Sequence, residues 1–155
     1  MIDGPLADDV SAQCERVLRS LPAWFGVESS LLEYVRETTT LPTFVARDAG
    51  EVVAFLSLRE HFAETWEVRC VAVQASHRRQ GIGRALHAHV EGWLSARAAR
   101  VVQVKTVAAG HPSPEYAQTR RFYASIGYVP VEVFPDLWTQ GLPVLQLIKP
   151  LLPRD

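Results

Sequence analysis

The stretch HRRQGIGRAL, residues 77–86, places three arginines and a histidine around two glycines, directly before a predicted helix. The N-terminus of a helix carries a partial positive charge and favours acidic residues in its first turn. Arg84 lies there instead, and no Asp or Glu occurs between Val68 and Val90. We therefore expect this loop to bind an anion.

The strand–loop–helix arrangement around this loop indicates the kind of anion. The run CVAV, residues 70–73, ends a predicted strand, and a helix is predicted over about residues 81–98. Gly81 and Gly83 let the backbone reach unusual φ angles and let a ligand approach closely. The first N–H groups of the helix point towards that ligand, and the arginines add charge-assisted donors suited to phosphate oxygens. The loop therefore favours a diphosphate.

Two common nucleotide-binding motifs do not fit this loop. A Walker A motif needs Lys followed by Ser or Thr after its glycines, and no such pair follows here. The dinucleotide fingerprint fails at its third glycine, where Leu86 stands. It also lacks a strand directly before it and an acidic residue about 20 positions on.

The composition bounds the class of protein. With 155 residues the chain is expected to be a single domain, residues 1–155, and 48% apolar and 21% charged residues are usual for a soluble globular protein. The net charge of −1 gives no pull towards nucleic acid or an anionic membrane, so we expect neither as a partner. The start MIDGPLADDV has no signal-peptide pattern and no apolar run reaches membrane-spanning length, so we expect a cytoplasmic protein.

The two cysteines, Cys14 and Cys70, are too few for a disulfide framework and lack metal-ligand spacing. We expect two free thiols in a reducing compartment and no metal.

Hydrophobic periodicity predicts an α/β fold with a mixed sheet flanked by helices. Helices are expected at about residues 10–21, 28–37, 81–98 and 116–126, and strands on either side of Asp48-Ala49-Gly50 within residues 43–61 and at 65–73, 101–107, 128–134 and 142–148. On the helix 81–98 the apolar residues form one stripe, and we expect His87 and His89 to face solvent.

The loop fits the pattern Arg/Gln-x-x-Gly-x-Gly/Ala at Arg78-Arg79-Gln80-Gly81-Ile82-Gly83, after a strand that ends in Val71-Ala72-Val73. Here the sequence resembles the GNAT superfamily of N-acetyltransferases, whose donor is acetyl-CoA. A second segment, RFYASIGY at residues 121–128, is similar to the family block that ends in Phe-Tyr-x-x-x-Gly-Phe/Tyr. The resemblance covers about residues 43–149 and implies a mixed, mostly antiparallel sheet. Residues 1–9 leave little room for the family's N-terminal strand, which could be missing.

The resemblance also implies which residues hold acetyl-CoA. Backbone N–H groups of Val71 and Val73 are expected to bind the pantetheine arm and the thioester carbonyl oxygen, as in an oxyanion hole. The expected donor-binding residues are Val71, Ala72, Val73, Arg78, Arg79, Gln80, Gly81, Ile82, Gly83 and Arg84.

Acetyl transfer to an amine needs a base, because an ammonium with a pKa of about 10.4 is not nucleophilic. Glu67, fourteen residues before the first loop glycine, matches the glutamate base of some family members. Glu64 and His61 are alternatives, directly or through water. An ion pair with a cross-strand cation is the other interpretation of Glu67.

Strand alternation assigns the residues of the strand 65–73 to two faces. One face is expected to carry Glu67, Arg69, Val71 and Val73, and the other Val68, Cys70 and Ala72. Because Arg69 would then point away from Cys70 and could not lower its pKa, direct attack by the amine in a ternary complex is favoured over a Cys70 nucleophile.

Tyr123 matches the family's general acid. A tyrosine hydroxyl can hydrogen-bond or protonate the CoA thiolate, whose thiol has a pKa of about 8.5. The alternative is a core tyrosine that packs the helix on the sheet.

The resemblance implies that the acceptor enters opposite the CoA arm, between the early helices and the last strands. Candidates for its lining are Trp24, Phe25, Tyr34, His61, Tyr116, Phe134 and Trp138. No dense acidic patch selects a polyamine or aminoglycoside, so a small-molecule or peptide amine is expected. A homodimer is compatible with the sequence and stays open.

Two other functions remain in view. The first is a non-catalytic acyl-CoA-binding regulatory module of the same fold, and the presence of both Glu67 and Tyr123 favours the enzyme over it. The second is a nucleic-acid-binding domain that uses the basic loop, and the net charge of −1 argues against it.

Overall fold

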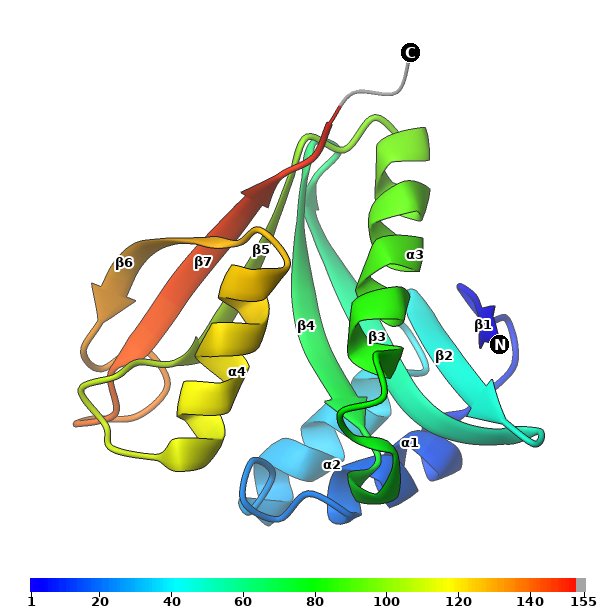
Figure 1. Cartoon of the computed structure of the whole chain (residues 1–155), viewed down its shortest axis with the longest axis horizontal. Helices are drawn as coiled ribbons and strands as arrows, with labels where there is room; N and C mark the ends of the chain where they lie inside the picture. Colours follow the sequence, from blue (N-terminus) through cyan, green and yellow to red (C-terminus); the bar gives the residue numbers. More distant parts are fainter. Residues whose placement is uncertain (153–155) are drawn as a thin grey trace.

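The structure of the protein, a computed structural model, describes residues 1–152 and has a central sheet with helices on both faces (Figure 1). Within these residues the strands are β1 (Ile2–Asp3), β2 (Thr43–Asp48), β3 (Glu51–Phe62), β4 (Thr65–Val73), β5 (Val101–Val107), β6 (Val129–Phe134) and β7 (Val144–Pro150). The helices are α1 (Ser11–Arg19), α2 (Glu28–Glu37), α3 (Ile82–Ala96) and α4 (Pro114–Ser125), with a short 3-10 helix, η1 (Ala75–His77).

The strands form one sheet in the order β1-β2-β3-β4-β5-β7-β6. All neighbours are antiparallel except β4 and β5, which are parallel. The expected mixed, mostly antiparallel α/β fold is therefore confirmed. The N-terminal strand, which residues 1–9 left in doubt, is present, because Ile2 and Asp3 pair with Ala46 and Val45 of β2.

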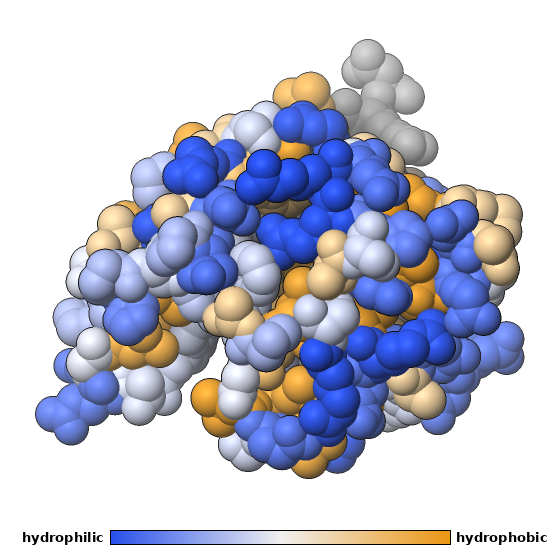
Figure 2. All heavy atoms as spheres, turned by 60° about the horizontal axis from the view of Figure 1, so that its bottom comes forward, coloured by the Kyte–Doolittle hydropathy of each residue, from blue (hydrophilic) through white to orange (hydrophobic). Residues whose placement is uncertain are grey.

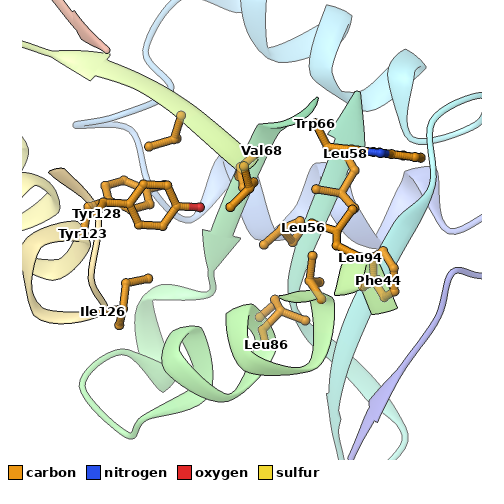
Figure 3. Packing of buried hydrophobic residues seen from close by; sticks show 14 of the residues in the cluster. Phe44, Leu56, Leu58, Trp66, Val68, Leu86, Leu94, Tyr123, Ile126 and Tyr128 are labelled. Atoms are coloured by element: carbon orange, nitrogen blue, oxygen red, sulfur yellow. The ribbon is translucent and has the colours of Figure 1, made fainter. Parts of the chain in front are cut away.

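Two apolar cores lie on opposite faces of the sheet. One joins Leu86, Val90 and Leu94 of α3 and Tyr123 to β2, β3 and β4, and part of it is seen in Figure 3. The other joins α1 and α2 to the opposite face of the same strands. Figure 1 shows α3 and α4 in front of the sheet and α1 and α2 behind it.

A β-bulge at Arg69 changes the faces of β4. Ser57 of β3 pairs with Cys70 and the next residue, Leu58, pairs with Val68, so Arg69 is the extra residue on β4. A bulge breaks the strict alternation of side chains and bends its strand. The expectation that Glu67 shares a face with Val71 and Val73 is therefore wrong.

The two cores show the actual assignment. Trp66 and Val68 belong to the α3 core, and Val71 and Val73 pack against that same core. Cys70 and Ala72 belong to the core of α1 and α2. Glu67, between Trp66 and Val68, thus faces the side of α1 and α2.

The parallel pairing of β4 with β5 is short. It holds for Thr65, Trp66 and Glu67, which pair with residues 101–103, and it ends there. β5 stays paired with β7 along its whole length, from Val101 to Val107. The two strands are therefore together at one end and diverge at the other, as Figure 1 shows, and we call the space between them the β4–β5 gap.

The bulge is held by an ion-pair network with α2. Glu37 accepts hydrogen bonds from Arg69 (Nε, 2.8 Å; Nη2, 3.0 Å) and from Arg59 (Nη2, 3.2 Å). The guanidinium of Arg69 also lies over the ring of Tyr34, 4.8 Å from its centroid. The Arg69 and Glu37 side chains are only 20% and 14% exposed, so removing either one would leave the other as an unpaired, largely buried charge, which destabilises the fold.

Replacing Glu37 with alanine should therefore destabilise the fold by about 1–3 kcal/mol, because two half-buried guanidinium groups lose their partner. Glu33→Ala is the matched control on the same helix: Glu33 is 54% exposed and 3.7 Å from Arg69, so its loss should stay within about 0.5 kcal/mol. Urea unfolding of both variants measures the difference, and equal losses would contradict the proposed anchoring of the bulge.

Candidate functional site

The open edge of β4 carries unpaired backbone donors. The N–H of Gln74 donates to the carbonyl of Val53 on β3 at 2.8 Å. Because N–H groups alternate between the two edges of a strand, those of Cys70 and Ala72 also point to β3. The N–H groups of Val71 and Val73 then point to the other edge, into the β4–β5 gap.

The loop between β4 and α3 is shaped to leave the helix N-terminus open. Arg79 and Gly81 both have positive φ angles, 63° and 80°. Gly81 is the N-cap residue of α3, no side chain caps the helix, and its first turn contains no acidic residue. The first N–H groups of α3 therefore remain available to an anion.

The two loop glycines differ in their surroundings. A Cβ on Gly81 would meet nothing within 4 Å, so the surface above it is open, but the positive φ disfavours other residues. A Cβ on Gly83 would lie 3.5 Å from Phe122 and 3.8 Å from Val73. Gly83 is therefore where α3 comes close to α4 and to the end of β4.

The three loop arginines have different partners. Arg78 stacks its guanidinium 4.2 Å from the ring centroid of Trp24, and Arg84 donates to the hydroxyl of Ser125 at 3.2 Å. Arg79 is exposed and its side chain makes no ion pair within residues 1–152. Burial, and then the neighbouring Arg79, lowers the pKa of Arg78, which agrees with mutual repulsion in this loop.

The other loop contacts tie it to the fold. His77 donates to the carboxylate of Asp48 in the β2–β3 hairpin at 2.8 Å, and its other ring nitrogen contacts the Ser76 hydroxyl at 2.8 Å. The N–H of Ala75 donates to the hydroxyl of Ser20 at 3.1 Å. His77 thus acts as a loop anchor.

Glu67 lies at the closed end of the β4–β5 gap, in the last residue pair between the two strands. Its carboxylate accepts hydrogen bonds from His61 Nε2 (2.7 Å) and from Lys105 Nζ (2.8 Å). Lys105 is a cation on the neighbouring strand, so the ion pair considered at the sequence level is present. The His61 side chain is 36% exposed, so the pair remains accessible from the side of α1 and α2.

These contacts set the protonation state of Glu67. Burial alone would raise its pKa, but the hydrogen bonds from Lys105 and then His61 outweigh burial, and the pKa lies below the ordinary carboxyl value. Glu67 is therefore ionised near neutral pH. Because its pKa is lowered on folding, it stabilises the fold above the ordinary carboxyl pKa, and that contribution is lost as the pH falls through the lowered value.

Tyr123 lies on the opposite face of the sheet, in the core of α3 and α4. It is 3% exposed, and burial, helped by the nearby Cys70 thiol, raises its pKa. Its hydroxyl therefore stays protonated at ordinary pH. Figure 3 shows Tyr123 and Tyr128 side by side next to Val68 of β4, at the start of the gap.

His87 is buried, not solvated, so that expectation is wrong. It is 1% exposed on the core side of α3, whereas His89 is exposed as expected. His87 is four residues after Gly83 and three residues before Val90, so it lies on the same side of the helix as these two residues. The helical period therefore predicted a buried position for His87.

The two thiols do not contribute a nucleophile. Cys14 and Cys70 are both buried and free. Burial raises the pKa of Cys14 to about 12, and burial also raises the pKa of Cys70. Neither forms a thiolate near neutral pH, in agreement with direct attack by an amine.

Most of the aromatic residues expected around the acceptor meet near α2. The hydroxyl of Tyr116 donates to the backbone carbonyl of Trp24 at 3.1 Å, and the indole N–H of Trp24 donates to Thr119 at 3.1 Å. Phe25 and Tyr34 form an edge-to-face pair with centroids 5.9 Å apart. The loop between α1 and α2 is thus joined to α4 across the wide end of the gap.

Phe134 and Trp138 belong to the β6–β7 hairpin on the other side of the gap. Trp138 is 46% exposed and Phe134 is half-buried. Figure 2 shows the notch between the lobe of α4, β6 and β7 and the rest of the molecule.

Other surface features lie away from this site. Two hollows, around Glu91 and Lys149 and around Glu64 and Arg100, occur at the paired end of β4 and β5. Of the residues considered for the site they include only Glu64, an alternative candidate for the base. Among residues 1–152 no group of three His, Cys, Asp or Glu side chains is arranged to hold a metal ion. No helix in this part of the chain is both long and apolar enough to span a membrane.

Two contacts of the site could not be identified from the sequence. One is the Lys105–Glu67 pair, whose partner could not be chosen without knowing which residues of β4 and β5 are opposite each other. The other is the stack of Arg78 on Trp24, between residues far apart in the sequence. The polar residues Gln103 and Lys105 in the strand VVQVKTV were the available signal of a polar face there.

Comparisons with known proteins agree with this geometry. A family model described as an acetyltransferase (GNAT) domain matches residues 40–130. No curated protein matches the chain.

Three solved structures show the same fold. A GNAT-family protein from Desulfovibrio desulfuricans has a TM-score of 0.82 at 18% identity and covers 98% of this chain and 99% of its own. The ribosomal-protein-S18-alanine N-acetyltransferase from Escherichia coli has a TM-score of 0.79 at 16% identity, with 100% and 96% covered. An aminoglycoside 6'-N-acetyltransferase complexed with coenzyme A has a TM-score of 0.77 at 21% identity, with 100% and 99% covered.

Replacing Lys105 with glutamine should raise the pKa of Glu67, because the variant removes the strongest contact that favours the carboxylate. Carbon-13 NMR of the Glu67 carboxyl group during a pH titration measures the shift. Lys149→Gln is the control, since Lys149 pairs with Glu91 at 2.6 Å instead. An unchanged Glu67 titration in Lys105→Gln, or the same shift in both variants, would contradict this account.

Proposed function

Because the chain belongs to the GNAT acetyltransferase family, we propose that it transfers the acetyl group of acetyl-CoA to a primary amine. The observation that carries the proposal is the β4–β5 gap, with the Val71 and Val73 N–H groups facing it and the cationic loop at its wide end. A pantetheine arm has amide groups that can pair with such an edge, and its diphosphate suits the helix N-terminus.

We propose that the loop residues Arg78–Arg84 hold the diphosphate. The open N–H groups of α3 and the exposed Arg79 guanidinium are the main donors. Arg84, exposed in the first turn of α3, adds a charge-assisted hydrogen bond, while Arg78 is stacked on Trp24 and supports the loop. Ala72 points its N–H to β3 and its side chain into the core of α1 and α2, so it contributes only by keeping Val71 and Val73 in place. Ile82 packs in the first turn of α3, and Gln80 is exposed in the loop.

The two faces of the sheet then have separate tasks. The donor lies on the side of α3 and α4, and its thioester reaches through the gap. The amine attacks the thioester carbonyl carbon from the side of α1 and α2, where Glu67 and His61 lie. The N–H groups of Val71 and Val73 stabilise the negative charge on the carbonyl oxygen.

We propose that Glu67 and His61 act together as the general base. A carboxylate with a lowered pKa is by itself a weak base for an ammonium group. Imidazole is the more usual base near neutral pH, and a carboxylate hydrogen-bonded to it stabilises the imidazolium. The proton of the amine thus passes to His61, or through a bound water molecule to the carboxylate of Glu67.

Tyr123 is the proposed general acid. As the carbon–sulfur bond breaks, its protonated hydroxyl donates to the CoA thiolate, which leaves as the free thiol. The raised pKa of Tyr123 means that it is available in the protonated form at any pH at which the enzyme works.

For the acceptor we propose a small-molecule or peptide amine with few positive charges. The names of two proteins of the same fold give an aminoglycoside and an alanine of ribosomal protein S18 as acceptors. In this chain the carboxylates on the acceptor side already have cations: Glu37 is bound by two arginines, and Glu67 by Lys105 and His61. Little negative charge is left for a polycation.

Isothermal titration with acetyl-CoA tests the donor site. Gly81→Glu should weaken binding roughly 100-fold, about 3 kcal/mol, since it places a carboxylate at the diphosphate. Gly50→Glu is a matched control, because Gly50 has φ 83° and open space, as Gly81 has φ 80° and open space, but lies in the β2–β3 turn. Binding that is unaffected by Gly81→Glu would remove the diphosphate assignment.

Steady-state release of CoA with a panel of amines tests the chemistry. Glu67→Gln and His61→Gln should each lower kcat by about 10²–10⁴ and flatten the pH profile near neutrality. Glu64→Gln is the control: its side chain is 64% exposed and 3.9 Å from Arg100, so the rate should be unchanged. Donor binding without CoA release from any amine would favour a regulatory module instead.

A further inference from the structure

Two buried polar atoms have no hydrogen-bond partner within residues 1–152: Nε2 of His87 and the hydroxyl of Tyr128. His87 lies on α3 and Tyr128 directly before β6, yet both belong to one cluster of rings. Buried polar atoms in proteins are nearly always hydrogen-bonded, so a pair of exceptions at one place calls for a physical reason.

Both rings pack on Tyr123. The His87 ring is perpendicular to the Tyr123 ring, with centroids 5.8 Å apart, and the Tyr128 ring is inclined by 68° at 5.2 Å. The Phe122 ring also packs here, with its centroid 5.4 Å from that of His87 and 5.5 Å from that of Tyr123. The ring centroids of His87 and Tyr128 are 6.4 Å apart, so the two rings are neighbours and both contact the Tyr123 ring.

Both groups are neutral near neutral pH. Burial, and then Lys149, lowers the pKa of His87 to about 3, while burial, then Tyr123 and Glu91, raises the pKa of Tyr128. A neutral imidazole nitrogen and a phenol hydroxyl can each donate or accept, depending on tautomer and rotation. One water molecule between them can therefore satisfy both atoms at once.

An apolar residue would have packed at position 87 without this requirement. The other buried positions of α3 are Leu86, Val90 and Leu94, which belong to the apolar core on this face of the sheet. A histidine there adds a polar atom to an otherwise apolar core, which has a cost unless the atom is bound. A contribution of His87 to function would account for this cost, and the functional group next to His87 is Tyr123.

Resting on the proposed role of Tyr123 as general acid, we propose that His87 is a positioning residue for it. His87 and Tyr128 hold one buried water molecule between them, and the resulting rigid pair of rings fixes the Tyr123 ring so that its hydroxyl faces the thioester sulfur. His87 itself neither contacts the substrate nor changes its charge during the reaction.

The kinetic test uses His87→Leu and His87→Gln, because a glutamine amide can reach the place of Nε2 and a leucine cannot hydrogen-bond. His87→Leu should lower kcat by about 10- to 100-fold through misplacement of the acid, with the KM for acetyl-CoA unchanged. His87→Gln should restore most of the lost rate. A purely structural role would lower kcat equally in both variants, or raise KM with it.

Combination with Tyr123→Phe shows whether His87 acts through Tyr123. In the Tyr123→Phe background, His87→Leu should have no further effect on kcat. If Tyr123→Phe lowers kcat but the two substitutions act additively, the positioning role is wrong while the proposed function stands. If Tyr123→Phe leaves kcat unchanged, the role of Tyr123 as acid is wrong, and the positioning role is wrong with it.

A stability measurement tests the shared water independently of activity. If His87 and Tyr128 bind the same water, His87→Leu and Tyr128→Phe should each destabilise the protein in urea, and the second substitution should cost less once the first is made. Additive effects would show that the two atoms do not share a partner and would overturn the proposal. Phe122→Leu combined with His87→Leu is the control for packing alone, since Phe122 touches His87 without a polar atom.

Discussion

The end of the pairing between β4 and β5 is the constraint on which the site depends. Three residue pairs hold the strands together, and after Glu67 the backbone groups of both facing edges lose their partners. Unpaired backbone groups inside a fold are unfavourable, and a short parallel ladder can end in this way only if other contacts hold the strands. On one side β5 is paired with β7 throughout, and on the other side β4 is paired with β3 beyond Val73.

The bulge at Arg69 makes this divergence compatible with two packed cores. It bends β4 just after its last pair with β5, and it returns Val71 and Val73 to the α3 core while Cys70 and Ala72 fill the core behind. The extra residue needs a partner outside the sheet, and Glu37 and Tyr34 of α2 supply it. A single irregularity therefore links α2, which borders the proposed acceptor side, to the strand edge that faces the proposed donor site.

The conformation of the loop between β4 and α3 could be predicted from the sequence better than the contacts around Glu67, and the reason is physical. A loop that must leave a helix N-terminus open needs glycine at a positive φ and excludes acidic residues, and both requirements are visible in HRRQGIGRAL. A β-bulge needs no particular residue types, because it depends on how two strands align. The faces of β4, the Lys105 partner of Glu67 and the two-residue strand β1 all depend on pairings between distant segments.

His87 shows a different reason for error. The helical period placed it beside the apolar stripe, but its polarity favoured a solvated position, and the structure follows the period. Polar residues on the buried face of a helix are therefore worth separate attention, because polarity alone assigns them to the surface.

The separation of the proposed base and the proposed acid on opposite faces of the sheet follows from the same gap. Glu67 and His61 lie on the face of α1 and α2, and Tyr123 lies on the face of α3 and α4. The two apolar cores are on opposite faces of the sheet, so neither core contains both groups. The surroundings of the two proposed groups also differ. The side of Glu67 is ionic, with Glu67 and Glu37 paired to Lys105 and Arg69, whereas the side of Tyr123 is apolar and keeps Tyr123 neutral. A substrate ammonium group is better solvated on the ionic side of Glu67. On the apolar side of Tyr123 a thiolate is poorly solvated, which favours its protonation. The gap would thus join two environments of different polarity, each suited to one of the two proton transfers.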